Sequence, residues 1–138
     1  MQIDPRGPRF GAAISAVLLA VTVLLGPGPA GTVLLAVAAA LFAVGALRGP
    51  QGTLQGWVFR RWVRPRLTPP THLEDAAPPR FAQAVGLAVT LVGLALSPAV
   101  AVAVPAAAAV ALVAAFLNAA FGFCLGCEMY LAAQRLRA

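Results

Sequence analysis

The sequence contains no lysine, only four acidic residues, one histidine and two cysteines among its 138 residues. Two cysteines cannot form the several disulfides of a small secreted scaffold, and with one histidine they cannot supply four zinc ligands within one chain. Charged residues make up 10% of the chain and hydrophobic residues 61%, with a mean hydropathy of +0.88. Such a shortage of polar residues excludes an ordinary water-soluble domain.

All ten basic residues are arginines, and the net charge is +6. The arginines are sparse and mostly flank apolar runs, so they form no basic stripe with base-reading side chains, and we expect no nucleic-acid binding. Arginines beside apolar segments are typical of membrane-topology signals and of contacts with anionic lipid headgroups. The charge therefore indicates the lipid bilayer as a partner.

Four apolar runs contain no Asp, Glu, Lys or Arg; they cover residues 10–25, 30–47, 81–97 and 99–123. At about 1.5 Å per residue, even the shortest is long enough to cross most of a hydrocarbon core about 30 Å thick. Backbone amides must be hydrogen-bonded internally in lipid, so each run is predicted to be a helix. The sequence thus predicts an all-α polytopic membrane protein with four transmembrane helices, forming a single domain over residues 1–138.

The arginines all fall on one side of this four-helix topology. Two precede the first run, six lie in the connection 48–80 and two follow the fourth run. The GPGP turn at 26–29 and the region near Pro98 contain none. By the positive-inside rule, the arginine side is the cytoplasm, and both termini are predicted to be cytoplasmic.

Within the long connection, TLQGWVFRRWVRPRL (53–67) has apolar residues at helical spacing and arginines between them. This pattern predicts a short helix in the membrane interface, with Trp57 and Trp62 at headgroup depth. A docking face for a soluble partner is the alternative. Prolines make the rest of the connection an extended loop, in which His72 is expected to be solvated.

FGFCLGCEMY (121–130) places Cys124 and Cys127 three residues apart, near the cytoplasmic end of the fourth run. In a helix interior, residues at this spacing have β-carbons about 5–6 Å apart, whereas a disulfide needs about 3.8 Å. The pair closes readily at a helix N-terminus, where free N–H groups and the helix dipole favour a thiolate. The chemistry of the pair therefore depends on whether a helix begins there.

We expect Gly122 to break the fourth helix and CLGCEMYLAAQRLR to begin an amphipathic helix with its apolar residues facing lipid. Gly126 would then leave the approach to the sulfurs open. Glu128 would lie in the first turn, where it stabilises the helix and opposes a thiolate, or relays a proton.

Three interpretations of the cysteine pair remain open. The first is thiol redox or persulfide transfer, which CxxC spacing facing a reducing cytosol favours. The second is a metal site completed by a second subunit of a homo-oligomer or by a partner. The third is packing of small apolar residues at a helix interface. No cofactor is expected, and no quinone motif is visible. The only amides within the runs, Gln83 and Asn118, are expected to join helices by hydrogen bonds, with contact to a quinone or substrate as the alternative.

DPRGPRF (4–10) and FGFCLGCEMY, on a four-span chain of this size, resemble the small bacterial membrane proteins catalogued as domain of unknown function 4395. That family is common in actinobacteria and carries an FCxGC motif. Its members tend to be encoded near thioredoxin-like proteins and thiosulfate sulfurtransferases, so the resemblance implies a plasma-membrane protein in a setting of thiol or sulfur metabolism. The positions that it marks are Asp4, Arg9, Cys124 and Cys127.

The sequence therefore predicts a membrane-embedded thiol- or sulfur-handling protein. Its pair would exchange a disulfide or persulfide with a cytosolic thioredoxin-like or sulfurtransferase protein. Either cysteine could attack while the other resolves, and the order of roles in soluble CxxC proteins favours Cys124 as the attacking thiol. Arg9 would stabilise the thiolate and Glu128 would relay a proton. The alternatives are a non-catalytic membrane scaffold that docks such a partner and a dimeric metal-binding CxxC site.

Overall fold

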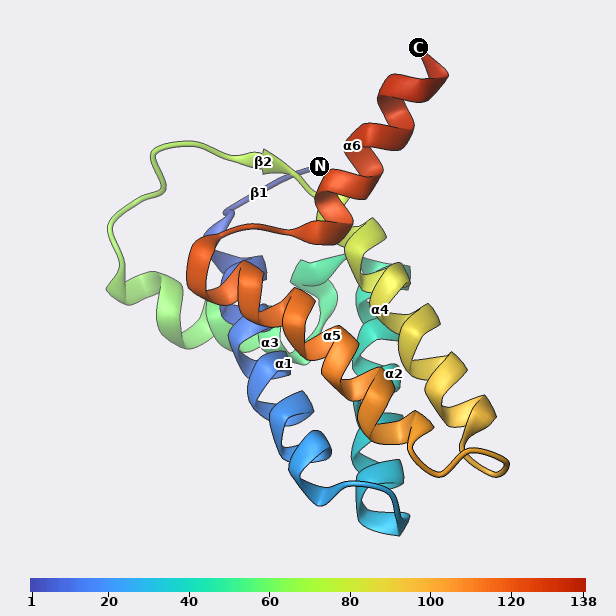
Figure 1. Cartoon of the computed structure of the whole chain (residues 1–138). Helices are drawn as coiled ribbons and strands as arrows, with labels where there is room; N and C mark the ends of the chain where they lie inside the picture. Colours follow the sequence, from blue (N-terminus) through green and yellow to red (C-terminus); the bar gives the residue numbers. More distant parts are fainter.

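The structure, a computed structural model, describes all 138 residues and is built almost entirely of helices (Figure 1). In chain order, the elements are β1 (Gln2–Ile3), α1 (Arg6–Leu25), α2 (Pro29–Arg48), η1 (Pro50–Gly52), α3 (Leu54–Val58), η2 (Phe59–Val63), η3 (Arg64–Arg66), β2 (Glu74–Asp75), α4 (Ala77–Leu96), α5 (Ala103–Phe121) and α6 (Leu125–Arg137).

Four helices, α1, α2, α4 and α5, are long and apolar enough to cross a membrane. Each has 19 or 20 residues, which is close to 30 Å at about 1.5 Å per residue. Only 24 of the 138 residues are buried within the chain, and many leucines and valines on the four helices are exposed. These surfaces need a lipid bilayer around them, so the predicted all-α, multi-pass membrane architecture is confirmed.

The ends of these helices differ from the predicted runs. α1 and α4 each begin four residues earlier than predicted, at Arg6 and Ala77. The first turn of α1 takes in Pro8, and that of α4 takes in Pro78 and Pro79, at positions where a missing N–H does no harm. α5 begins four residues later than predicted, at Ala103, because residues 97–102 form the turn from α4. Hydropathy identifies the part of the chain that lipid surrounds. The residues at which each helix begins and ends depend instead on local turn geometry.

The four helices pack as a bundle in which α1 lies against α2 and α5, and α4 lies against α2 and α5. Leu19, Leu35 and Val104 are fully buried at its centre. Thr22 and Thr90 are also fully buried, and each hydroxyl donates a hydrogen bond to the carbonyl four residues earlier, at 2.8 and 2.9 Å. The core therefore contains no unpaired hydroxyl.

All ten arginines lie at one end of the bundle or beyond it. The N-termini of α1 and α4 meet the C-termini of α2 and α5 there, and both chain termini lie beyond this end (Figure 1). The turns 26–28 and 97–102 lie at the opposite end and carry no charge. The charge asymmetry predicted from the sequence is thus a property of the folded bundle.

The helical segment predicted over 53–67 is present as α3, η2 and η3, which follow one another between α2 and α4. Phe59 is buried, and its ring lies 5.8 Å from that of Phe10 in α1. Trp57 and Trp62 are each 50% exposed. The segment therefore packs one side against α1 and presents its tryptophans outward, as an interfacial helix requires.

A two-stranded antiparallel sheet, which the sequence pattern does not predict, joins the N-terminus to the proline-rich loop. Gln2 pairs with Asp75 and Ile3 with Glu74, and the Ala76 N–H donates to the carbonyl oxygen of Met1 at 2.9 Å. This pairing holds the loop across the arginine end of the bundle, next to the start of α6 (Figure 1).

Asp4 connects the start of α1 with η3. Its side chain is 4% exposed, and its oxygens accept hydrogen bonds from the backbone N–H, Nε and Nη2 of Arg6 at 3.0, 3.0 and 2.7 Å. Arg64 Nε lies 4.0 Å from the same carboxylate. The side-chain hydrogen bond from Arg6 holds the pKa of Asp4 below its usual value, although burial acts in the opposite direction.

We predict that Asp4→Asn destabilises the protein in a pH-dependent way. A lowered folded-state pKa stabilises the folded state fully above the ordinary carboxyl pKa of about 3.9, and this stabilisation is lost as pH falls toward the folded-state pKa. The melting temperature in detergent should fall by about 2–8 °C at pH 7, and the difference should narrow steadily below about pH 4. The exposed Glu74→Gln is the control; a pH-independent difference for Asp4→Asn would contradict the role of its charge.

Candidate functional site at the cysteine pair

The helix break predicted at Gly122 is confirmed. Gly122 adopts φ 68° and ψ 15°, a left-handed conformation that glycine adopts without steric cost. Its N–H donates to the carbonyl of Asn118 at 3.0 Å, and the Phe123 N–H donates to that of Leu117 at 3.2 Å. This pair of bonds terminates α5 and turns the chain away from its axis.

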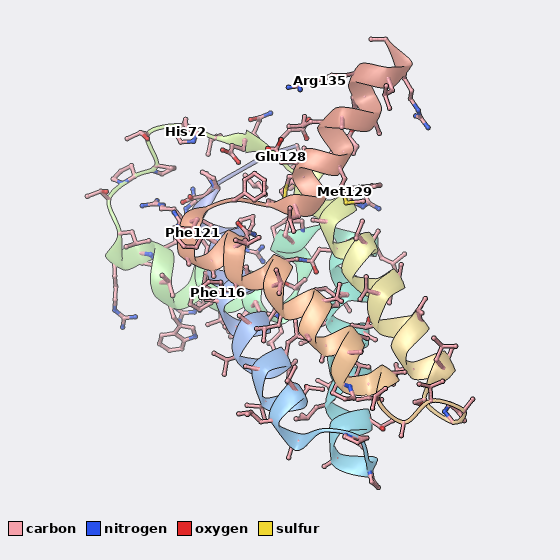
Figure 2. The ribbon with its side chains drawn as sticks, viewed as in Figure 1. His72, Phe116, Phe121, Glu128, Met129 and Arg135 are labelled. Carbon is pink, nitrogen blue, oxygen red and sulfur yellow. A yellow bond between two sulfur atoms is a disulfide. The ribbon has the colours of Figure 1, made fainter.

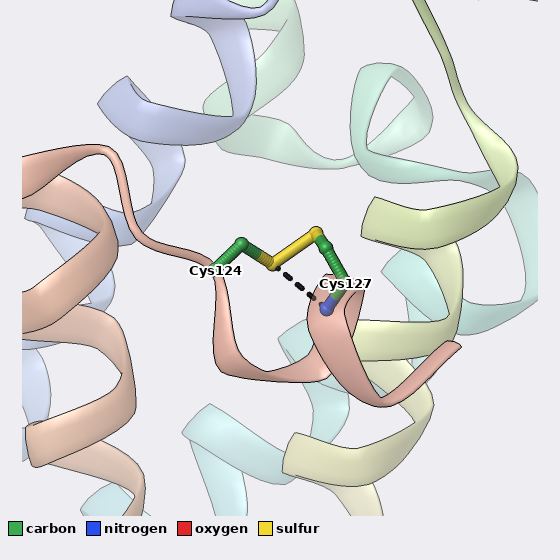
Figure 3. The surroundings of a disulfide bond; sticks show 2 residues. All are labelled: Cys124 and Cys127. Carbon is green, nitrogen blue, oxygen red and sulfur yellow. Dashed lines mark hydrogen bonds between the residues drawn. A yellow bond between two sulfur atoms is a disulfide. The ribbon is translucent and has the colours of Figure 1, made fainter. Parts of the chain in front are cut away.

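Cys124 then caps the N-terminus of α6. Its backbone is extended, with φ −93° and ψ 103°, and its Sγ accepts a hydrogen bond from the Cys127 N–H at 3.2 Å (Figure 3). The two cysteines form a disulfide with their α-carbons 5.1 Å apart. Because Cys124 lies outside the helix proper, the pair closes without distorting a helical turn.

Gly126 has a different role from the one predicted. It is buried, and an added β-carbon would lie 2.5 Å from the Cα and Cβ of Ala82 in α4. Glycine therefore lets the first turn of α6 sit directly on α4, and it does not open the approach to the sulfurs. The rings of Tyr130 and Phe81 extend this contact, with centroids 5.7 Å apart. Beyond this turn α6 projects away from the bundle with its residues exposed (Figure 1).

A polar cleft of about 560 Å³ brings together all four residues proposed from the sequence as the site, namely Cys124, Cys127, Arg9 and Glu128. Both cysteines are half-buried. The first turn of α1, the end of α5, the proline-rich loop and the first turns of α4 and α6 form its walls. Asp4 does not line this cleft; it lines a separate cavity between the start of α1 and the segment 50–64.

The sequence analysis missed three members of the cleft, His72, Glu74 and Asp75. His72 is exposed, as predicted, yet its Nε2 lies 3.4 Å from Glu74 Oε1. His72 and Glu128 lie at the end of the bundle from which α6 projects (Figure 2). The β1–β2 pairing places this loop, and nothing in the local sequence signals that pairing.

Arg9 stands between the end of α5 and the cleft. Its Nη2 donates to the carbonyl of Ala119 at 3.2 Å, and its guanidinium carbon lies 3.6 Å from the position of a β-carbon at Gly122. The C-terminus of α5 carries partial negative charge, which would oppose a thiolate nearby. The arginine offsets that charge and adds a cation to the cleft that contains both sulfurs.

No group of three or more His, Cys, Asp or Glu side chains is placed to hold a metal ion. The cysteine pair provides two sulfur ligands, and a structural zinc site needs four. A metal at this pair would therefore need ligands from a second chain.

Four membrane-spanning helices, with a CxxC pair that begins a further helix at their arginine-rich end, define a multi-pass membrane protein with a candidate thiol site. Residues 3–135 match the family described as Domain of unknown function (DUF4395), and the chain belongs to this family. No curated protein and no solved structure matches the chain. The family resemblance proposed from the sequence is thus confirmed, and the family description names no activity.

We predict that Arg9→Gln slows alkylation of Cys124, measured with iodoacetamide at pH 7 in a Cys127→Ser background. Loss of a partly exposed cation near a thiolate should raise the activation free energy of alkylation by about 0.5–1 kcal/mol, which lowers the rate about two- to fivefold. High salt should reduce the difference in rate between the variant and its parent.

Arg80→Gln is the matched control, because Arg80 also caps a helix, donating to the Ala46 and Leu47 carbonyls at the end of α2, but does not line the cleft. Arg9→Lys should retain most of the rate. Equal slowing in the Arg9→Gln and Arg80→Gln variants would show that helix capping alone accounts for the effect.

Proposed function

We propose that the protein handles thiols or sulfur at the membrane, exchanging a disulfide or persulfide between its Cys124–Cys127 pair and a thioredoxin-like or sulfurtransferase protein. The observation that carries this proposal is the position of the pair at the start of α6, half-exposed in a polar cleft that also contains Arg9. Cysteines that serve only as packing residues are typically buried among apolar neighbours. An accessible pair at a helix N-terminus suits exchange chemistry.

In the proposed exchange, a thiolate of the partner attacks Cys124 Sγ, a mixed disulfide forms, and Cys127 leaves as a thiolate. The second thiol of the partner then resolves the mixed disulfide, so the partner is oxidised and the pair is reduced by two electrons. In persulfide transfer, the Cys124 thiolate attacks the outer sulfur of the partner's persulfide and the partner leaves as a thiolate. Both steps are reversible exchanges at sulfur.

The local hydrogen bonds support Cys124 as the sulfur that bonds to the partner. Its Sγ receives the Cys127 N–H, and the free N–H groups of α6 surround the same position. Glu128 in the first turn, and the His72–Glu74 pair across the cleft, supply groups that accept or return a proton.

The proposed location of the cleft is the cytoplasmic face of a bacterial plasma membrane. The positive-inside rule assigns the arginine-rich end of a multi-pass protein to the cytoplasm, and the cysteines lie at that end. A partner from a reducing cytosol would then reach the pair directly.

A single-cysteine variant should identify the partner. In Cys127→Ser, the Cys124 thiolate attacks the disulfide of an oxidised partner in the reverse of the proposed exchange, and Cys127 is no longer present to resolve the mixed disulfide, which should accumulate on non-reducing gels. Cys124→Ser should trap at least about tenfold less, since a hydrogen bond to a charged sulfur contributes about 1.5–3 kcal/mol. Mass spectrometry of the trapped species identifies the partner. A partner that co-purifies equally well with both cysteines replaced by serine would favour the scaffold alternative.

The orientation has a separate test in native membranes. After reduction, a membrane-impermeant maleimide should label the two cysteines in inverted vesicles and not in intact spheroplasts, because the cleft opens to the cytoplasm in the proposed topology. A cysteine introduced at Gly28, in the opposite turn, should label in the reverse pattern and serves as the control. Labelling of the native pair only from outside would overturn the assigned orientation.

A further inference from the structure

A second, apolar cavity meets the polar cleft at the cysteine pair. It has a volume of about 260 Å³, lies among α1, α2, α4, α5 and the start of α6, and 12 of its 19 lining residues are hydrophobic. Cys124 lines both the cleft and this cavity, whereas Cys127 lines only the cleft. The Cys124 residue therefore stands between a polar compartment and an apolar one.

The apolar cavity reaches the lipid-facing surface of the bundle. Val110, within the spanning part of α5, lines it and is 60% exposed. Deeper in the bundle its walls include Phe42, which is buried. A hydrophobic molecule dissolved in the bilayer can therefore enter without passing through water.

Two amides line the cavity without a hydrogen-bond partner for their side chains within the chain. These are Gln83 in α4 and Asn118 in α5, both half-buried. The sequence predicted that they join helices by hydrogen bonds, and the structure shows no such bond for either side chain. Asn118 also lines the polar cleft, whereas Gln83 does not. An unpaired amide in a membrane-spanning helix costs free energy, and a hydrogen-bond acceptor bound beside Gln83 would remove that cost.

We propose that this cavity binds the ring of a membrane quinone, which reoxidises the reduced Cys124–Cys127 pair. A quinone combines an apolar tail soluble in lipid with two carbonyl oxygens that accept hydrogen bonds from amides. The cavity is slightly smaller than the roughly 300–1,000 Å³ typical of sites for whole small molecules, which suits a single ring with its tail left in the bilayer. This inference rests on the proposed thiol exchange and adds the electron acceptor.

The reaction balances as a two-electron, two-proton transfer. The S–H bonds of Cys124 and Cys127 break and the S–S bond forms, while two electrons and two protons pass to the carbonyl oxygens of the quinone and give a hydroquinone. Oxidation of a partner dithiol at the cleft then reduces the pair again. Over one cycle, the partner dithiol and the quinone become a partner disulfide and a hydroquinone.

The test uses full-length protein in lipid nanodiscs, with decylubiquinone as the probe. The protein is first reduced until both cysteines can be alkylated. The expected result is loss of both alkylatable thiols with formation of one hydroquinone for each disulfide formed, that is, one for every two thiols lost. The intact mass should be lower by two hydrogens, with no quinone adduct. The ring of this quinone is fully substituted, which disfavours simple thiol addition.

Ala114→Phe should fill the cavity and slow this oxidation by about tenfold or more, a loss of about 1.4 kcal/mol in transition-state stabilisation. Val113→Phe is the matched control, because Val113 is the next residue of α5, is 56% exposed and does not line the cavity. Gln83→Met, which removes an amide that lines the cavity but not the cleft and changes the side-chain volume little, should also slow the reaction with the quinone.

Reaction of each reduced variant with the water-soluble hydroxyethyl disulfide provides the folding check and separates the two proposals. Oxidation of the wild-type pair by this reagent but not by decylubiquinone would overturn the quinone site and leave the proposed exchange standing. Equal rates in the Ala114→Phe and Val113→Phe variants would also overturn the quinone site. A pair that neither reagent oxidises would overturn both proposals. If Ala114→Phe fails the folding check, Gln83→Met decides.

Discussion

The reversal of the chain at Gly122 is the constraint on which the cysteine site depends. A single unbroken helix from α5 through α6 would place both sulfurs on one helical face, with β-carbons about 5–6 Å apart and every nearby N–H already bonded. The left-handed glycine ends α5 and leaves Cys124 extended ahead of α6. The cysteine that would have been one more apolar residue of a spanning helix thereby becomes a helix cap with free N–H groups around its sulfur.

The same break brings two helix ends of opposite partial charge close together, and arginines bind the carbonyls at the negative end. A helix C-terminus and a helix N-terminus lie within a few residues of each other, and their partial charges are opposite. Arg9 donates to the last turn of α5, and Arg80 donates in the same way at the end of α2. Arginines at the polar end of the bundle therefore set the charge asymmetry of the chain and also satisfy carbonyls that a helix terminus leaves without partners.

The features that could be predicted from the sequence are those for which lipid or a helix end requires particular residues. Apolar runs without charge indicated four spanning helices, and a glycine before CxxC indicated a helix start at the pair. The contribution of the proline-rich loop could not be predicted, because β1 and β2 are two residues each and show no periodicity, yet their pairing brings His72 to the cleft. The buried contact of Gly126 with Ala82 and the unpaired side chains of Gln83 and Asn118 depend on distances between helices, which local sequence does not encode.

The two compartments around Cys124 give a physical reason for unequal roles of the two sulfurs. In the proposed cycle, electrons arrive from a water-soluble thiol and leave to an acceptor in the bilayer, so one sulfur must be reachable from both sides. Of the two cysteines, Cys124 lines both the polar cleft and the apolar cavity, and Cys127 lines the cleft alone. Cys124 is then the sulfur common to both half-reactions. Cys127, in the first turn of α6, leaves as a thiolate when the partner attacks Cys124 and re-forms the disulfide with Cys124 when the pair is reoxidised. The assignment of the attacking thiol thus rests on the position of each residue, independently of the order of the two cysteines in the chain.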